Sequence, residues 1–446
     1  MSDLIQARIL KGFRDFLPEQ EIERALLIEK LTATFRLFGF VPIDTPALEY
    51  SEILLRKSDG ETEKQVFRFE DNGGRDVSLR FDLTVPFARF VAEHKAELYF
   101  PFKRYHIAKV WRGEKPQAGR YREFVQCDFD IVGSDSASVD FEILALMKTA
   151  LDSIGVSAVT IKVSHRGIFN RFLANRGLTA KSEDILRTVD KRGKIGTEET
   201  GRLLEELAGA ENARVILDYI QCEPVTGTER IEQFSRTLEK IERLAGGPAA
   251  DTARLRDIHN FMKARGIAAS YVLDPSITRG LDYYTGVVYE TFLDELPSIG
   301  SVCSGGRYDN LAGLYMKEQV SGVGSSIGLD RLIAGLEQLR GNSPQPGKAS
   351  FTEVTVFCQS AESLPLYHSL AAAFHRAGIS CEVFPEAKKM AQQYAWAEKK
   401  TIRWGILASD DGQTVQLKNL SNRDSFDVTI VDAIKKIQDS RSTPAT

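Results

Sequence analysis

The spacing of apolar residues along the chain predicts a succession of helices and strands. In residues 21–38 apolar side chains recur every three to five positions and Gly39 follows, which predicts an amphipathic helix closed by a left-handed glycine. Alternating or clustered apolar residues predict strands at 40–46, 66–69, 77–81, 99–111, 124–132 and 159–163. Because few helices separate these strands, we expect a largely antiparallel sheet in an α+β fold.

The pattern changes in the second half of the chain. Residues 166–260 are rich in Arg, Lys, Glu and Leu with helical spacing, and strand-like segments return at 287–292 and 300–303, which indicates a helical insertion into a sheet domain. Residues 342–350, which include two Pro and a Gly, are typical of a linker, and alternating strands and helices follow them. The expected organisation is a core domain at 1–165 and 261–340, a helical insertion at 166–260, a linker at 341–350 and an α/β domain at 351–446.

Composition is that of an ordinary globular protein. The 446 residues are 43% hydrophobic and 27% charged, and 58 Lys and Arg nearly balance 62 Asp and Glu. Disordered and collagen-like chains are therefore excluded, and an anionic partner must be bound by local patches. The five cysteines form no Cys-x-x-Cys pair, so neither a disulfide framework nor a zinc site is indicated. With no signal peptide and no long apolar run, we expect a cytoplasmic protein without a membrane span.

The densest run of cations lies at residues 103–122, which contain seven Lys and Arg. This run favours a phosphate or nucleic acid ligand, although a solvated loop would have the same composition. Alternate residues of a strand share a face, so Phe124, Gln126, Asp128 and Asp130 are expected to line one surface. There an aromatic ring can stack on a purine, and carboxylates can bind an amine or an imidazole. The alternative is that Phe124 belongs to the core and the acids are exposed.

Three short strings resemble the signature motifs of class II aminoacyl-tRNA synthetases. They are Gly39-Phe40-x-x-Ile43-x-x-Pro46-Ala47-Leu48, Trp111-Arg112-Gly113-Glu114 with Arg120-x-x-x-Phe124, and Gly328-Leu329-Asp330-Arg331. Longer strings at 79–86, 126–130, 279–285 and 305–309 resemble the histidyl-tRNA synthetase family in particular. The resemblance covers essentially the whole chain. It implies a class II catalytic domain with an antiparallel sheet flanked by helices, a helical insertion, and a C-terminal α/β domain that binds the anticodon.

The resemblance also implies roles for individual residues. Arg112 and Arg279 would be catalytic, because two fixed guanidiniums can stabilise the charge that develops on the ATP α-phosphate. The residues expected to bind ATP are Arg112, Glu114, Arg120, Phe124 and Arg331. The residues expected to bind histidine are Asp82, Leu83, Thr84, Gln126, Asp130, Tyr283, Tyr284 and Tyr308. Pro46 would lie at a dimer interface.

The activity implied by the resemblance is the ligation of histidine to tRNA-His. L-histidine, ATP and tRNA-His would be the substrates of a homodimer, and Mg²⁺ would accompany ATP through ligands that the sequence does not identify. The alternative is a non-catalytic histidine-binding paralogue, such as the regulatory subunit of ATP phosphoribosyltransferase. That paralogue generally lacks the anticodon-binding domain and the residues that bind ATP, whereas this chain retains both, so the ligase is favoured.

Overall fold

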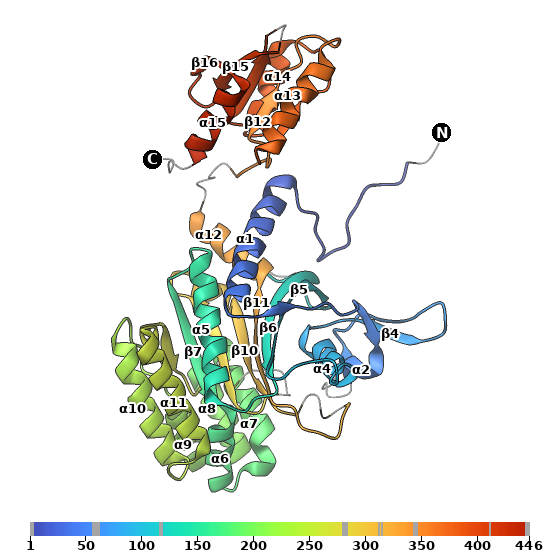
Figure 1. Ribbon diagram of the computed structural model, residues 1–446. Coiled ribbons are helices and arrows are strands. Elements are labelled where there is room, and N and C mark those ends of the chain that lie inside the picture. The colour runs from blue at the N-terminus through green and yellow to red at the C-terminus, as the bar shows by residue number, and fades with distance from the viewer. Residues whose placement is uncertain are drawn as a thin grey trace. The chain divides into compact units, whose positions relative to one another are not determined.

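The computed structural model describes residues 4–55, 63–115, 119–278, 284–310, 313, 315–341, 347–409 and 412–441. The chain forms two compact units (Figure 1). The larger unit contains Met1–Arg14 and Ile28–Asn342, and the smaller unit contains Asp15–Leu27 and Ser343–Thr446. Within the described residues, no helix is both long enough and apolar enough to cross a bilayer.

The larger unit is built on an eight-stranded sheet with the order β1-β5-β6-β11-β10-β9-β7-β8. In that order the strands are Val41–Pro42, Phe102–Trp111, Glu123–Val132, Gly322–Gly328, Cys303–Tyr308, Val287–Leu293, Val159–His165 and Tyr271–Leu273. All pairs from β5 to β7 are antiparallel, and the pairs at the two edges, β1 with β5 and β7 with β8, are parallel. The predicted α+β fold is therefore confirmed, with parallel pairs added at the edges.

The strand predicted at residues 300–303 is wrong, because β10 begins only at Cys303 and continues to Tyr308. No strand was predicted for β11, the central neighbour of β6. Both strands are rich in glycine, which has no side chain to generate an alternating pattern and is depleted in strands generally. The predicted linker begins at residue 341, and residues 342–346 of it lie outside the described part of the chain.

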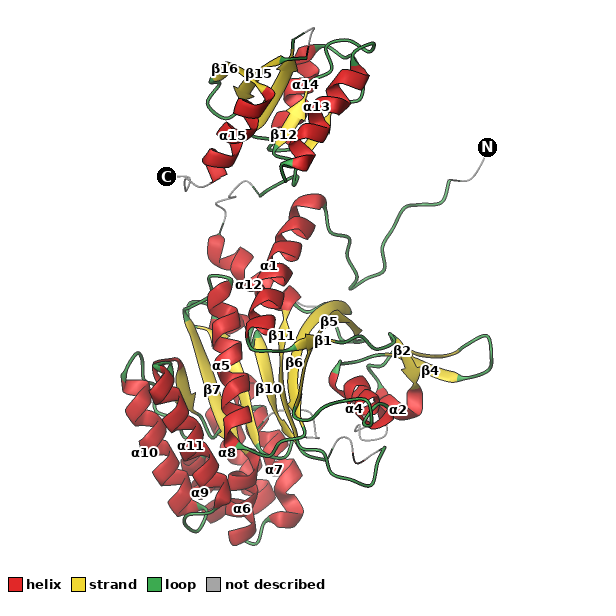
Figure 2. Ribbon diagram, in the orientation of Figure 1, coloured by secondary structure: helices red, strands yellow, loops and turns green. Residues whose placement is uncertain are grey.

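Helices cover one face of this sheet (Figure 2). The predicted helix at 21–38 is confirmed as α1 (Pro18–Leu37), and Gly39 follows it with φ +78°. From α1, Phe35 packs its ring 5.1 Å from that of Phe129 on β6. Helix α5 (Ala137–Ser153) buries its apolar side chains on the same sheet, and α12 (Leu329–Arg340) follows β11 directly. The opposite face of β6 is thereby left to polar side chains.

A smaller sheet lies beside β5, and the segment that contains Asp82, Leu83 and Thr84 follows one of its strands. Its strands have the order β2-β4-β3 and span Leu48–Tyr50, Asp76–Leu79 and Arg68–Glu70. Helices α2 (Ser51–Leu55) and α4 (Thr84–Glu93) accompany it. Because α4 begins at Thr84, residues 82–84 lie at the N-terminus of a helix, where Asp82 Oδ1 accepts a hydrogen bond of 3.0 Å from the backbone N–H of Val85.

The predicted helical insertion is present between β7 and β8 (Figure 1). Its helices α6 to α11 are Arg166–Asn175, Ser182–Asp190, Arg192–Ala208, Ala210–Tyr219, Glu229–Leu244 and Ala250–Arg265. Short 3-10 turns lie at Thr179–Lys181 and Ala268–Ser270, and another, Pro297–Ile299, follows β9. The helices pack through buried apolar and aromatic residues such as Phe172 and Tyr219, whose ring centroids are 4.5 Å apart.

The smaller unit has a five-stranded sheet of its own with the order β13-β12-β14-β15-β16. In that order the strands are Cys381–Val383, Val354–Val356, Trp404–Ala408, Thr414–Asn419 and Ser425–Thr429. The helices α13 (Leu364–Arg376), α14 (Met390–Lys399) and α15 (Ile430–Arg441) supply the rest of the core. Strands β12, β13 and β14 are parallel, as the alternation of strand and helix patterns predicts.

Candidate active site

The uncovered face of β6 forms the floor of the candidate site. The registers place Asp130 between Arg104 of β5 and Gly324 of β11, and Asp128 between His106 and Ser326. Phe129 points the other way, towards α1. The expectation that alternate residues of this strand share a face is thus confirmed, and the alternative of an exposed acidic face is wrong because Asp128 and Asp130 are both buried.

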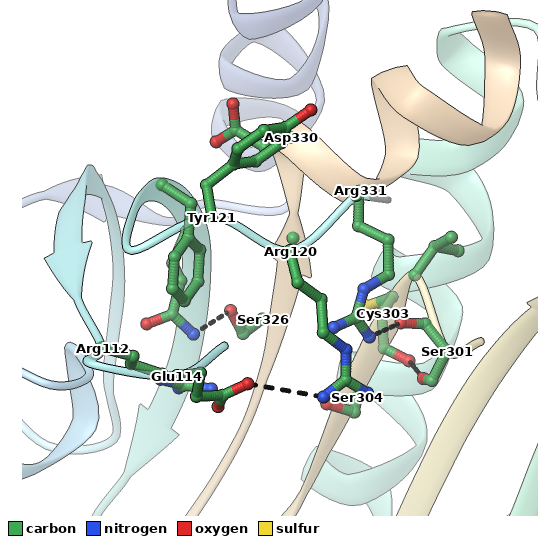
Figure 3. Close-up of a pocket in the computed structure, with 15 residues that line it drawn as sticks. Arg112, Glu114, Arg120, Tyr121, Ser301, Cys303, Ser304, Ser326, Asp330 and Arg331 are labelled. Carbon is green, nitrogen blue, oxygen red and sulfur yellow. Dashed lines mark hydrogen bonds and ion pairs between the residues drawn. The ribbon is translucent and has the colours of Figure 1, made fainter. Parts of the chain in front are cut away.

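One end of this floor opens into a pocket (Figure 3). Five of its lining residues are those predicted to bind ATP, and we call them the arginine-rich end: Arg112, Glu114, Arg120, Phe124 and Arg331. Gln126, predicted to bind histidine, also lines the pocket and donates a 2.9 Å hydrogen bond from Nε2 to Ser326 Oγ. The structure therefore brings these predicted residues together from β6, the segment after β5 and the start of α12.

Contacts hold the arginines of this end in defined positions. Arg112 donates from Nε to the carbonyl of Phe81 at 3.1 Å, and its guanidinium carbon lies 5.2 Å from the ring centroid of Phe124. Arg331 donates from Nη1 to the carbonyl of Ser301 at 2.8 Å. Arg120 Nη1 lies 3.4 Å from Glu114 Oε2, which is visible as a dashed line in Figure 3.

Sequence reasoning assigned no role to the residues that support this end. Asp330, next to Arg331, is buried, forms an ion pair with Arg14, and accepts a 2.6 Å hydrogen bond from the backbone N–H of Val125. The Arg14 guanidinium also lies 3.7 Å from the ring centroid of Tyr121. Asp330 thus ties the N-terminal segment and the start of β6 to the first turn of α12.

The other end of the floor is acidic and buried. We call five residues the acidic end: Asp82, Arg104, Asp128, Asp130 and Tyr308. Arg104 Nη2 lies 2.7 Å from Asp130 Oδ2, and the Tyr308 hydroxyl donates a 2.5 Å hydrogen bond to Asp130 Oδ1. Arg104 belongs to the run of cations predicted to bind phosphate or nucleic acid. That prediction is wrong for Arg104, because its side chain is fully buried.

Burial raises the pKa of each carboxyl at the acidic end, and that of Asp128 to about 7. The positive charge of Arg104 opposes the rise in the pKa of Asp128 and of Asp130, and at Asp82 backbone hydrogen bonds and the positive charges of Arg112 and Arg104 oppose it. Asp128 Oδ1 and Gln126 Oε1 are buried without a hydrogen-bond partner among the described residues. Three carboxyls beside one buried arginine favour a ligand that carries a cation or hydrogen-bond donors.

Glycines in β11 make room for these side chains. A methyl group at Gly324 would lie 1.8 Å from Asp130 Oδ1, and one at Gly322 would lie 2.4 Å from the ring of Tyr308. No side chain fits at either position. The glycines that concealed β11 in the sequence are therefore the ones that the site requires.

The remaining predicted residues lie around the acidic end or outside the described residues. Leu83 is buried, and its backbone carbonyl accepts a 3.3 Å hydrogen bond from Arg104 Nη2. Because its side chain is apolar, Leu83 can make polar contacts only through its backbone. Thr84 is the first residue of α4, and Tyr284 packs beside Tyr308. Arg279 and Tyr283 lie outside the described residues, and Pro46 lies on the exposed segment between β1 and β2.

Comparison with known proteins agrees over the whole chain. The family model of histidyl-tRNA synthetase matches residues 12–332, and that of an anticodon binding domain matches residues 353–440. A relative from Treponema denticola, named histidine-tRNA ligase, is 60% identical and covers 99% of this chain and 100% of its own length. A relative of the same name from Rhodopirellula baltica is 47% identical over 95% of this chain and 96% of its own.

A solved structure shows the same fold. The crystal structure of histidyl-tRNA synthetase from Nostoc sp. PCC 7120 matches with a TM-score of 0.85 at 27% identity, over 98% of this chain and 100% of that one. The family models, the relatives and the fold thus agree with the motifs that β5, β6 and α12 bring to one pocket. The chain belongs to the histidyl-tRNA synthetase family.

Proposed function

We infer that this chain is a histidine-tRNA ligase, and we propose that the arginine-rich end and the acidic end together form its adenylation site. The observation that carries the proposal is that strand β6 contributes residues to both ends. Phe124 lies at the mouth of the pocket, Gln126 lies between the two ends, and Asp128 and Asp130 are buried at the acidic end. A nucleotide at the first end and a small cationic amino acid at the second would meet near Gln126.

In the first step, a carboxylate oxygen of histidine attacks the α-phosphorus of ATP, a P–O bond forms, and pyrophosphate leaves. We propose that Arg112 stabilises the charge on the α-phosphate oxygens, because its guanidinium is already held by the carbonyl of Phe81 and the ring of Phe124. Arg279 would be the second arginine. In the second step a hydroxyl of the 3′-terminal adenosine of tRNA-His attacks the histidyl carbonyl, and AMP leaves.

For ATP, we propose that Phe124 stacks on the adenine with Arg331 on its other side. Glu114 would accept a hydrogen bond from the adenine amino group, and Arg120 would bind the γ-phosphate. The Glu114–Arg120 contact of 3.4 Å is partly exposed, so it can be exchanged for contacts with ATP at little cost.

For histidine, we propose that Asp130, Tyr283, Tyr284 and Tyr308 surround the imidazole, and that Asp82, Leu83, Thr84 and Gln126 surround the α-amino group. An analogue without ring nitrogens would leave Asp130 buried with one partner fewer, which costs roughly 1–3 kcal/mol. Selection of histidine would then need no separate hydrolytic site.

The remaining expectations complete the proposal. The catalytic domain would comprise residues 1–165 and 261–340, with the insertion at 166–260, a linker at 341–350 and the anticodon-binding domain at 351–446. Mg²⁺ would accompany ATP, because it neutralises the charge of the phosphates and is usually held by them with one or two carboxylates. A cytoplasmic homodimer would form around Pro46, where Leu48 and Tyr50 are exposed.

The non-catalytic regulatory paralogue is not favoured. The relatives are named histidine-tRNA ligase, and an anticodon binding domain matches residues 353–440. The five ATP candidates also line one pocket rather than being dispersed.

The test is exchange of pyrophosphate into ATP with each of the twenty amino acids, followed by charging of tRNA-His. We expect exchange with histidine alone, and a loss of about 10²- to 10³-fold in Arg112→Ala. Arg202→Ala is the matched control, because Arg202 is exposed on α8 and pairs only with Glu199 and Glu206 of its own helix among the described residues. Histidine binding without exchange would overturn the proposal in favour of the regulatory paralogue.

A further inference from the structure

A series of ion pairs, centred on the buried Asp140 and Arg307, runs from the helical insertion to the strand that carries Tyr308. Helix α11 packs on α5, and Arg254 Nη1 of α11 lies 2.7 Å from Asp140 Oδ2 of α5. The other oxygen, Asp140 Oδ1, accepts a 2.9 Å hydrogen bond from Arg307 Nε of β10. Arg307 Nη1 lies 3.1 Å from Asp309 Oδ1 just beyond the end of that strand.

The series ends at the segment that contains Tyr284. Thr285 donates a 2.6 Å hydrogen bond from Oγ1 to Asp309 Oδ2 and a 2.8 Å hydrogen bond from its backbone N–H to the carbonyl of Arg307. Its neighbour Tyr284 packs on β10, since a methyl group added at Gly306 would lie 2.9 Å from the Tyr284 ring. The position of Tyr284 is thus set in part by the contacts of Thr285, together with a 3.1 Å hydrogen bond from Arg166 Nη1 to the Tyr284 carbonyl.

Strand β10 transmits these contacts through the sheet. Adjacent residues of a strand point to opposite faces, so Arg307 reaches Asp140 on the face covered by helices while Tyr308 reaches Asp130 on the face of the site. A shift of Arg307 would therefore displace both Tyr308 and the backbone that holds Thr285. Arg254 is the member of the series that comes from the insertion.

Burying the charges of Asp140 and Arg307 costs free energy of desolvation, which argues that this network has a role other than stabilising the fold. Asp140 and Arg307 are buried, and burial raises the pKa of Asp140 while both arginines oppose that rise. Apolar residues of similar volume often stabilise a core as well as a buried ion network does. A network of fixed hydrogen-bond geometry instead holds the strand in one position.

We propose that Arg254, Asp140 and Arg307 are positioning residues for histidine, and that the insertion helix α11 thereby sets the geometry of the amino acid pocket. The inference rests on the proposed assignment of Tyr284 and Tyr308 to that pocket. It predicts an effect mainly on histidine, because none of the five residues of the arginine-rich end lies on β10 and that strand lines their pocket only at its start, with Cys303 and Ser304.

The test is Arg254→Ala, compared with Arg254→Lys and with Arg256→Ala. Arg254 is the best member to change because its side chain is 18% exposed, so the fold should tolerate its loss. Arg256 is the matched control on the same helix, where its guanidinium binds Glu242 of α10. Histidine and ATP are varied separately in pyrophosphate exchange, histidine affinity is measured by equilibrium dialysis without ATP, and thermal unfolding is recorded for each variant.

We expect Arg254→Ala to lower kcat/KM for histidine by about 10- to 100-fold and to weaken histidine binding, with KM for ATP unchanged. Arg254→Lys should recover part of the loss, and Arg256→Ala should match the wild type. Equal changes in the parameters for histidine and ATP, or an Arg254→Ala variant identical to Arg256→Ala, would overturn the proposal. Absence of exchange in the wild type would instead refute the function on which it rests.

Discussion

The two ends of the site differ in how their charges are held. At the arginine-rich end, the side chains of Glu114 and Arg120 are 29% and 31% exposed and 3.4 Å apart. At the acidic end, Arg104 is fully buried and contacts Asp130 at 2.7 Å. An exposed ion pair typically contributes about 0–1 kcal/mol, whereas breaking a buried pair costs about 3–5 kcal/mol. The Glu114–Arg120 pair at the first end can therefore rearrange around a ligand, whereas the Arg104–Asp130 pair at the second end is fixed before the ligand arrives.

This difference suits the two proposed ligands. ATP is large and is bound by many contacts, so flexible charges at the pocket mouth can adjust to its phosphates. Histidine is small, and discrimination against other amino acids depends on polar groups that would be left unpaired by the wrong side chain. Specificity should accordingly reside at the acidic end, and each prediction below compares a change there with a change elsewhere.

The largest effect is expected from Arg104→Met. This change leaves Asp82, Asp128 and Asp130 buried without their shared cation, so we expect a loss of about 3–5 kcal/mol in the free energy of unfolding at neutral pH. Urea unfolding followed by circular dichroism measures it. Arg75→Met, which removes an exposed partner of Asp71, should leave the midpoint unchanged. A small effect in both variants would contradict a preorganised acidic end.

The next effect is a dependence of stability on pH that arises from Asp128. Burial raises its pKa from the ordinary value of 3.8 to about 7 in the folded protein, so the folded state holds an extra proton between those pH values. Stability contributed by this group is therefore lost as pH rises through that window. The Asp128→Asn variant has no carboxyl at this position and should not lose this stability. The difference in free energy of unfolding between the variant and the wild type should therefore shift in favour of the variant by about 2–3 kcal/mol between about pH 5 and about pH 8.

Urea midpoints of wild type and Asp128→Asn at several pH values measure this growth. Asp71→Asn is the control of opposite sign, because hydrogen bonds from Arg75 lower the pKa of Asp71. That group contributes its stability above its unfolded pKa and loses it only in acid, so the control should show no trend across the same range. If the difference in free energy of unfolding between Asp128→Asn and the wild type did not change with pH, the Asp128 carboxyl of the wild type would have to be ionised over the whole pH range.

How far these features could be predicted depends on the range of the interaction. Helix α1 and strands β5 and β6 are set by local apolar periodicity, and all three were predicted within a few residues. The shared face of Phe124, Gln126, Asp128 and Asp130 follows from alternation alone. Motif resemblance located the five ATP candidates before any geometry was known.

Features that depend on contacts between distant segments could not be predicted. Gly322 and Gly324 occur in β11 because Tyr308 and Asp130 need their space, and these partners lie on the neighbouring strands β10 and β6. Arg104 has the composition of a surface cation and is buried only because the strand pairing brings Asp130 beside it. The series of contacts from Arg254 to Thr285 also joins segments that are distant in sequence, the insertion and the core, and no local sequence pattern predicts it.

A smaller effect is expected from Tyr308→Phe. Loss of the hydroxyl leaves Asp130 Oδ1 without its 2.5 Å hydrogen bond, and we expect kcat/KM for histidine to fall by about 10- to 100-fold. Tyr121→Phe is the matched change at the arginine-rich end, where Arg14 contacts the ring rather than the hydroxyl. Its kinetic parameters should be close to those of the wild type. Equal losses in both variants would remove the distinction between the two ends.

The smallest effect is expected from Arg120→Ala, which removes the partly exposed partner of Glu114. The free energy of unfolding should change by less than about 1 kcal/mol, and the change should shrink further in high salt because exposed charges are screened. KM for ATP should nevertheless rise several-fold, since Arg120 is proposed to bind the γ-phosphate. Urea unfolding at low and high salt, with pyrophosphate exchange at varied ATP, separates these terms. A destabilisation as large as that of Arg104→Met would show that the pocket mouth is as rigid as the acidic end.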